Sequence, residues 1–178
     1  MITFVVLFDI DGTLLSSAVA QDVLQCYSDA IRDVVGQAPN VAPRQFAGMV
    51  DPQICQILLT ELGLTSEKID YFIPKVFSRV SELYRRTDKR ITLNKGVEVL
   101  LPLLVKSPKH VVGVLTGNLE QIANEKLAHA GIISYFSGFY CADRYFDRTR
   151  LAADAVNRCL KISAPPQQEH NDSRRHTP

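Results

Sequence analysis

The fold is decided by residues 4–14, which read Phe4-Val5-Val6-Leu7-Phe8-Asp9-Ile10-Asp11-Gly12-Thr13-Leu14. The first five of these residues are apolar and include two valines, which predicts a strand buried on both faces. Side chains two apart on an extended segment point the same way, with their Cα atoms roughly 6 to 7 Å apart. We therefore expect Asp9 and Asp11 to reach one small site at the carboxyl end of this strand, where open α/β sheets bind their ligands.

Two carboxylates this close repel each other unless a cation lies between them. Mg²⁺ suits such a site because it prefers oxygen ligands and keeps several of its waters. Gly12 permits a tight turn, and Thr13 adds a hydroxyl and a backbone N–H nearby. The alternative is an ordinary strand and Asp-Gly turn in which Asp9 is only a cap. The agreement of several independent features favours the metal site.

The run Asp9-Ile10-Asp11-Gly12-Thr13-Leu14 resembles the first motif of the haloacid dehalogenase-like superfamily in its phosphatase form. The resemblance implies that Asp9 is a nucleophile that forms an aspartyl-phosphate and that Asp11 is the general acid and base. It also implies a Mg²⁺ cofactor at Asp9 and Asp11. Members that cleave carbon–halogen bonds lack the second Asp, so Asp11 favours phosphate chemistry over dehalogenation.

Composition places the chain among ordinary soluble globular proteins. Its 178 residues suffice for one domain with a lid or insertion, and 46% are hydrophobic and 22% charged. The net charge of +1 gives no indication of a nucleic-acid or membrane partner. The four cysteines are widely spaced without a metal-binding pattern, so we expect reduced, mostly buried thiols and a cytoplasmic location. The apolar run at the N-terminus is too short for a signal peptide or a membrane span.

The segment between the first strand and the next α/β unit is expected to be helical. Apolar residues recur at three- and four-residue steps before and after a proline-containing loop at 37–52, and Pro74 should kink or break the last helix. The family has a helical cap at this place. We therefore expect a cap at 16–87 and a core formed by 1–15 and 88–162. The alternative is a set of core helices with no lid role.

The loop of this cap contains the residues most expected to face the site, Arg44, Gly48 and Asp51. Arg44 is a candidate for binding a substrate anion, and its alternative is a solvated loop arginine. The polar run at 85–90 is expected to be the hinge back to the core.

A second buried strand, Val111–Leu115, ends in Thr116, Gly117 and Asn118. A hydroxyl and free backbone N–H groups at a strand-to-helix turn suit a phosphate, because a helix N-terminus is electropositive. The turn resembles the second motif of the family, in which Thr116 would hold the transferring phosphoryl group. A third strand is expected at 136–141.

The family also needs a cation, usually Lys, in a third motif, and the segment here has no Lys before Lys161. Arg148 most resembles the Asp-Arg variant of that motif, and Arg150 is the second candidate. Arginine supplies a permanent charge in a fixed fork. The alternative is that Arg148 only pairs with Asp147 or lies at a solvated helix N-terminus.

The family's fourth motif, a buried strand ending in an acidic pair that holds Mg²⁺, is expected soon after Ile162. Residues 163–178 contain no apolar run and predict a disordered tail instead. Read one nucleotide later, codons for Glu169 through Pro178 can encode Ile-Met-Ile-Val-Gly-Asp-Thr-Pro, which resembles the missing motif. The hypothesis is a frameshift, which the nucleotide sequence decides. Without that strand, residues 4–8 would form an open, apolar sheet edge.

The sequence thus predicts an α/β fold: a three-layer Rossmann-like parallel sheet of the haloacid dehalogenase-like type, with a helical cap inserted after the first strand and the final strand missing. The resemblance, over residues 1–162, implies a phosphoglycolate phosphatase-like, Mg²⁺-dependent enzyme acting on small phosphorylated metabolites. One alternative is a catalytically impaired fragment or pseudo-phosphatase. Another is a phosphomutase or dehalogenase of the same superfamily. Nothing in the sequence indicates which ester is the substrate or what the oligomeric state is.

Overall fold

A computed structural model describes residues 4–16, 19–41, 46–86 and 91–163 of the chain. Its elements, in chain order, are β1 (Phe4–Phe8), α1 (Val19–Val35), α2 (Asp51–Glu61), α3 (Ser66–Arg86), α4 (Val97–Lys106), β2 (His110–Leu115), α5 (Glu120–His129), the 3₁₀ helix η2 (Ile133–Tyr135), β3 (Gly138–Tyr140) and α6 (Arg148–Ser163). None of the helices within these ranges is long and apolar enough to cross a membrane.

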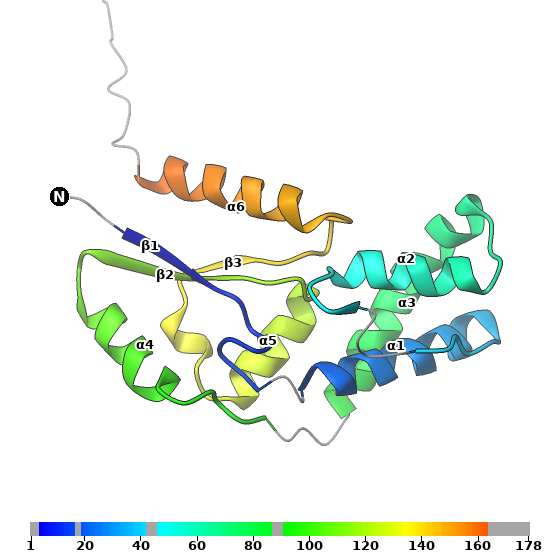
Figure 1. Cartoon of the computed structure of the whole chain (residues 1–178), viewed down its shortest axis with the longest axis horizontal. Helices are drawn as coiled ribbons and strands as arrows, with labels where there is room; N and C mark the ends of the chain where they lie inside the picture. The colour runs from blue at the N-terminus through cyan, green and yellow to red at the C-terminus, as the bar shows by residue number, and fades with distance from the viewer. Residues whose placement is uncertain (1–3, 17–18, 42–45, 87–90, 164–178) are drawn as a thin grey trace, which may run out of the picture.

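The sheet has three parallel strands in the order β1-β2-β3 (Figure 1). Phe8 pairs with Val114, and Leu115 pairs with Tyr140. Because the strands run the same way, the residues that follow them meet at one edge of the sheet. This register brings the turns after β1 and β2 side by side.

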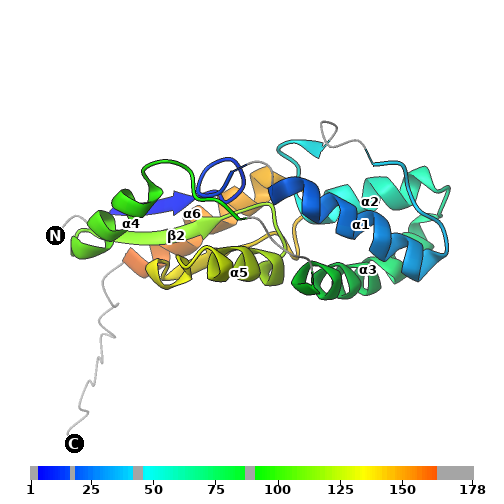
Figure 2. The ribbon, with the colours of Figure 1, turned by 90° about the horizontal axis from the view of Figure 1, so that it is seen from below.

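Helices cover both faces of the sheet, with α4 and α5 on one face and α6 on the other (Figures 1 and 2). Successive residues of β2 alternate between the two sides, as the period of a strand requires. Val114 shares a core with Leu101 of α4 and Leu127 of α5, whereas Leu115 packs in a second core that contains Leu151 of α6. The predicted three-layer α/β fold is confirmed.

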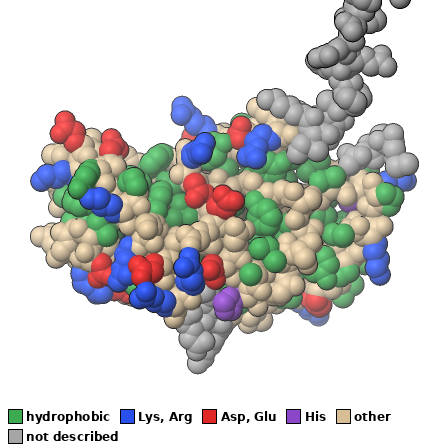
Figure 3. Space-filling model, turned by 180° about the vertical axis from the view of Figure 1, so that it is seen from behind, with side chains coloured by type: hydrophobic (Ala, Val, Ile, Leu, Met, Phe, Trp, Pro, Cys, Tyr) green, Lys and Arg blue, Asp and Glu red, His purple; other side chains and the backbone are tan. Residues whose placement is uncertain are grey.

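Helices α1, α2 and α3 form a separate layer beyond the carboxyl ends of the strands (Figures 1 and 2). They share one apolar core, which Ile122 of α5 and Leu119, the residue just before that helix, join from the side of the sheet. The face of this layer seen in Figure 3 mixes acidic and basic side chains. Within the layer, Arg79 of α3 lies 2.7 Å from Asp33 and 2.8 Å from Glu82.

Strand β1 is less buried than its sequence indicated. Phe4 is 56% exposed and the other four residues are half-buried, which corrects the expectation of a strand covered on both faces. The reason is its place at the edge of the sheet that the described residues form, and such an open, apolar edge is what the sequence predicted without the fourth-motif strand. Apolar side chains also remain exposed on α4, namely Val99, Leu100, Leu103 and Val105.

Several element boundaries differ from those expected. Helix α3 runs without interruption across Pro74, so the proline does not break it. The third strand is shorter than the predicted 136–141 and runs only from Gly138 to Tyr140. Ser163 belongs to α6 rather than to the predicted tail, and residues 164–178 lie outside the described part of the chain, as do 87–90 of the predicted hinge.

Gly113 in the central strand has no room for a side chain. A Cβ there would lie 2.9 Å from Leu7 Cδ2 and 3.1 Å from the carbonyl oxygen of Gly138. We expect Gly113→Ala to lower the free energy of unfolding by about 1 to 3 kcal/mol, measured in urea, because the neighbouring strand would have to move. Gly138→Ala is the matched control, since its Cβ would meet only Tyr140 side-chain atoms at 3.5 Å or more. Equal effects of the two substitutions would contradict this account.

Candidate active site

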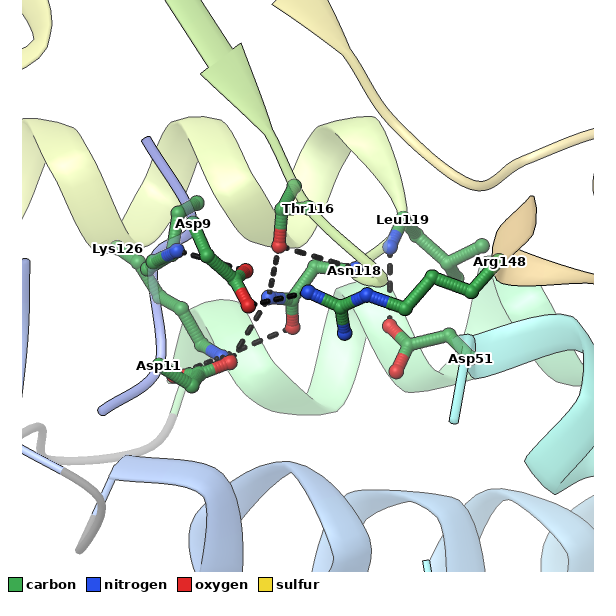
Figure 4. Close-up of polar contacts among 9 residues, drawn as sticks. Asp9, Asp11, Asp51, Thr116, Asn118, Leu119, Lys126 and Arg148 are labelled. Atoms are coloured by element: carbon green, nitrogen blue, oxygen red, sulfur yellow. Dashed lines mark hydrogen bonds and ion pairs between the residues drawn. The ribbon is translucent and has the colours of Figure 1, made fainter. Parts of the chain in front are cut away.

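Side chains from three segments far apart in the sequence converge at the carboxyl edge of the sheet (Figure 4). Asp9 and Asp11 follow β1, Thr116 follows β2, and Arg148 opens α6. The spacing of Asp9 and Asp11 predicted a common site for the two carboxylates. Figure 4 shows both at one side of the space that Thr116 and Arg148 also face.

Asp9 is held through both of its carboxylate oxygens. Its Oδ1 accepts the N–H of Ile10 at 2.9 Å, and its Oδ2 forms an ion pair with Nη2 of Arg148. The Arg148 side chain is partly exposed, at 42%. A cation therefore lies directly against the carboxylate that the sequence proposed as the nucleophile.

Tertiary structure distinguishes between the two arginine candidates. Arg148 forms an ion pair with Asp9. Arg150 is exposed at the start of α6, and its charge helps to lower the pKa of Asp147. The N–H of Thr149 donates to Asp147 at 2.6 Å and is the main reason that the pKa of Asp147 is lowered. Asp147 thus caps α6, and the pairing of Arg148 with Asp147, the alternative considered from the sequence, is not the arrangement found.

Asp11 is paired with a lysine that sequence analysis did not single out. The ammonium of Lys126, from α5, lies 2.6 Å from Asp11 Oδ2 and 2.8 Å from Asp11 Oδ1. The Lys126 side chain has no exposed surface, and that of Asp11 is 24% exposed. A buried ammonium without a partner would be strongly destabilising, so this pair constrains both residues.

The position of Lys126 in the sequence indicates its role, although it lies far from the third-motif segment near residue 148. It lies on the face of α5 that is otherwise apolar and buried, beside Ile122, Ala123 and Leu127. Lysine is almost never fully buried unless it is paired. A lysine within an apolar helical stripe is therefore a sign of an internal ion pair.

The turn Thr116-Gly117-Asn118 is organised by the side chain of Asn118. Its Nδ2 donates to Thr116 Oγ1 at 2.8 Å and to Asp11 Oδ2 at 2.8 Å, and its Oδ1 accepts from Lys126 Nζ at 2.9 Å. The backbone N–H of Asn118 also donates to Thr116 Oγ1, at 3.3 Å. Thr116 is fully buried and Asn118 nearly so. The turn and the β1 loop are thus one hydrogen-bonded network.

Asp51 connects the helical layer to this turn. Its backbone N–H donates to the carbonyl of Gly117 at 2.7 Å, and its Oδ2 accepts the N–H of Leu119 at 2.9 Å. Asp143 accepts the next N–H, that of Glu120, also at 2.9 Å. The first two donors at the start of α5 are therefore taken by carboxylates from two other segments, which satisfies donors that a helix leaves unpaired.

The contact at Gly117 is close enough to exclude any side chain. A Cβ there would lie 2.8 Å from the carbonyl oxygen of Met49 and 3.3 Å from Val50 Cα. The segment that leads into α2 therefore rests directly on the turn. Gly117 is needed for this close approach of two backbones.

Burial changes the ionisation of Asp51. It raises the pKa of this carboxyl from its ordinary value of 3.8 to about 7, while the charge of Lys126 and the N–H of Leu119 oppose the rise. Tyr27 of α1 is also fully buried, and burial together with the Asp51 charge raises the pKa of its hydroxyl. Asp51 is thus an acid in an apolar layer at the edge of the site.

The other two predicted cap residues are less informative. Arg44 lies outside the described residues. Gly48 is exposed, with φ of +81°, in the turn that precedes Asp51.

The oxygen donors of Asp9 and Asp11 are of the kind that Mg²⁺ prefers, and Mg²⁺ sites often use only one or two carboxylates and several waters. The described residues contain no group of three or more His, Cys, Asp or Glu side chains that could hold a metal ion. Arg148 and Lys126 each balance the charge of one carboxylate. The donor set fits Mg²⁺ in kind, and the Asp11 carboxylate is the more fully engaged of the two.

Comparison with solved structures supports the fold. A predicted phosphoglycolate phosphatase from Haemophilus somnus 129PT is 20% identical over 94% of this chain and 74% of its own, with a TM-score of 0.63. CbbY from Rhodobacter sphaeroides, in complex with phosphate, is 15% identical over 93% and 75%, also with a TM-score of 0.63. A β-phosphoglucomutase from Clostridium difficile is 18% identical over 88% and 72%, with a TM-score of 0.61. No curated protein matches the sequence.

The sequence itself matches a family model described as haloacid dehalogenase-like hydrolase over residues 6–164. This match begins within β1 and includes all helices that bring residues to the site and the turn that contains Thr116. The chain belongs to the haloacid dehalogenase-like hydrolases, as the resemblance in its first strand predicted.

Proposed function

We propose that this hydrolase is a Mg²⁺-dependent phosphatase that cleaves small phosphate monoesters through an aspartyl-phosphate on Asp9. The observation that carries the proposal is the ion pair between Asp9 and Arg148 at the end of β1, next to a network that contains both Asp11 and Thr116. A nucleophile, a fixed cation, a hydroxyl donor and a second carboxyl are the groups that phosphoryl transfer to a carboxylate needs.

In the proposed reaction, a carboxylate oxygen of Asp9 attacks phosphorus, and the bond from phosphorus to the ester oxygen breaks. Arg148 and the hydroxyl of Thr116 stabilise the charge that develops on the phosphoryl oxygens. Asp11 gives its proton to the departing oxygen and then takes a proton from the water that hydrolyses the aspartyl-phosphate. Asp9 is regenerated and inorganic phosphate leaves.

The carboxylates of Asp9 and Asp11 would hold Mg²⁺. Both oxygens of Asp11 also accept hydrogen bonds from Lys126. When bound, the ion withdraws negative charge from the phosphoryl group and from the attacking carboxylate.

We assign the layer of α1, α2 and α3 at 16–87 the role of a cap, and the sheet with α4, α5 and α6 the role of the core. The contacts of Asp51 with Gly117 and Leu119 support this assignment, because they seat the layer on the turn proposed to bind phosphate. A closed cap excludes water, which protects a phospho-enzyme and strengthens its electrostatic interactions. Arg44 and Gly48 remain candidates for contact with the substrate from the same loop.

One observation favours a second candidate, a catalytically impaired form of the same enzyme. The described residues offer two carboxylates at the site, and β1 lies at an open edge of the sheet. A phosphomutase would share all the groups named here. Relocation of phosphate within the substrate, rather than its release, distinguishes the phosphomutase.

Substitution of Asp9 tests its proposed role as the nucleophile. Asp9→Asn is expected to lower Mg²⁺-dependent turnover of p-nitrophenyl phosphate by at least about 1,000-fold, because an amide cannot form the covalent intermediate. Asp70→Asn, in an exposed position on α3, is the matched control and should retain activity. Turnover that survives in Asp9→Asn overturns the mechanism. A wild-type chain with no turnover at any Mg²⁺ concentration supports the impaired form.

Burial of Asp51 predicts a pH dependence of stability. Its raised pKa means that the folded state keeps a proton that the unfolded state has lost, so the stability that Asp51 contributes falls as pH rises from about 4 to about 7. Asp51→Asn removes this dependence. We expect its free energy of unfolding, relative to wild type, to increase by on the order of 4 kcal/mol between pH 4 and pH 8.

Denaturation in urea at a series of pH values provides the measurement. Asp143→Asn is the control, because it removes an exposed carboxylate from the same helix end, where water screens the charge. If both variants show the same slope against pH, burial of Asp51 is not the cause.

A further inference from the structure

We propose that Lys126 is a positioning residue that sets the direction of the hydrogen bonds linking Asp11, Asn118 and Thr116, and so presents the Thr116 hydroxyl proton and the Asp11 carboxyl to the substrate. The inference deepens the proposed phosphatase function and rests on it. The Lys126 side chain is fully buried and takes no direct part in the proposed reaction, yet it makes three hydrogen bonds within the site.

The ammonium of Lys126 is saturated. It has three N–H donors and no acceptor. Its three contacts are Asp11 Oδ2 at 2.6 Å, Asp11 Oδ1 at 2.8 Å and Asn118 Oδ1 at 2.9 Å. Because the side chain is fully buried, water does not compete for these donors. Lys126 therefore requires both carboxylate oxygens of Asp11 and the amide oxygen of Asn118 to lie close to its ammonium as hydrogen-bond acceptors.

This requirement determines the orientation of the Asn118 amide. An ammonium accepts no hydrogen bond, so Asn118 must turn its oxygen toward Lys126 and its NH₂ group away from it. The two N–H donors of that group then go to Asp11 Oδ2 and Thr116 Oγ1. The opposite orientation would set NH₂ against the ammonium and oxygen against the carboxylate, with repulsion at both ends.

The amide in turn determines what the Thr116 hydroxyl can do. Its oxygen accepts the Asn118 Nδ2–H at 2.8 Å and the Asn118 backbone N–H at 3.3 Å, which occupies both lone pairs. The hydroxyl proton is left to be donated. Thr116 is fully buried at the end of β2 and faces the space beside Asp9 (Figure 4). A phosphoryl oxygen in that space would receive this proton as a hydrogen bond.

A lysine that only neutralised Asp11 would leave Thr116 unaffected, and this difference is measurable. The test is a double-mutant cycle on the binding of inorganic phosphate by the full chain, followed by calorimetry, with Lys126→Met, Thr116→Val and the double variant. Each single substitution is expected to weaken binding by about tenfold, the value of a hydrogen bond to a charged group. The double variant should bind no more than about threefold more weakly than either single, because both remove the same donation.

Independent losses that multiply to about 100-fold in the double variant overturn the inference, since a loss of charge alone would be additive with Thr116→Val. Unchanged binding in Lys126→Met also overturns it. Lys106→Met, an exposed position at the end of α4, controls for the loss of one positive charge elsewhere on the chain. Absence of phosphate binding by the wild-type chain overturns the proposed function and this inference together.

A second readout follows Asp11. Lys126→Met is expected to reduce kcat for phenyl phosphate by at least about tenfold more than kcat for p-nitrophenyl phosphate, because phenolate is the poorer leaving group and needs the positioned acid. A merely structural defect would lower both rates by the same factor, and that result would contradict the role for Asp11. By contrast, Asp9→Asn should remove both activities alike.

If Lys126→Met does not fold, Asn118→Leu replaces it. This substitution leaves the pair of Lys126 and Asp11 in place but removes the amide that links it to Thr116. Phosphate binding should again be weakened by about tenfold and be non-additive with Thr116→Val. Full additivity in this cycle would be as damaging to the inference as in the first.

Discussion

A lysine ammonium with no access to water is the constraint on which the rest of the site depends. Lys126 is held on the apolar face of α5, so it must find its acceptors within the protein, and Asp11 and Asn118 supply them. Removing one member of such a buried pair costs far more than a surface ion pair contributes. The pair therefore ties the loop after β1 to a helix more than one hundred residues later in the chain.

Helix α5 is the junction of the molecule. Its apolar residues belong to two cores, since Ile122 packs with the α1–α3 layer and Leu127 packs against the sheet. Its first turn receives Asp51 from one side and Asp143 from the other. Any opening of the helical layer must break the contacts of Asp51 and disturb the turn at Gly117. The position of the helical layer and the geometry of the turn proposed to bind phosphate are thereby coupled.

In contrast to the buried Lys126 network, strand β1 lies at an open edge of the sheet that the described residues form. Phe4 and the outer face of α4 leave apolar surface in water, and the backbone of β1 has an unpaired side in the described fold. Edges of this kind favour pairing with other strands. The residues of the site follow this same strand, so its stability bears directly on where Asp9 and Asp11 lie. The chain spans about three quarters of the length of the solved structures compared with it.

Local sequence pattern is enough to predict the first two strands, the helical layer between them, and the placement of Asp9, Asp11 and Thr116 at strand ends. Periodicity and turn residues carry that information. Which charged side chains pair in the site depends on tertiary structure. Arg148 and Arg150 are two residues apart and equally charged, and only the direction of α6 selects Arg148. Lys126 became part of the site only through the packing of α5, because a contact between residues 11 and 126 leaves no trace in local periodicity beyond one charged residue in an apolar stripe. Burial of β1 was overestimated for the same reason, since a strand's composition does not state how many neighbours it has.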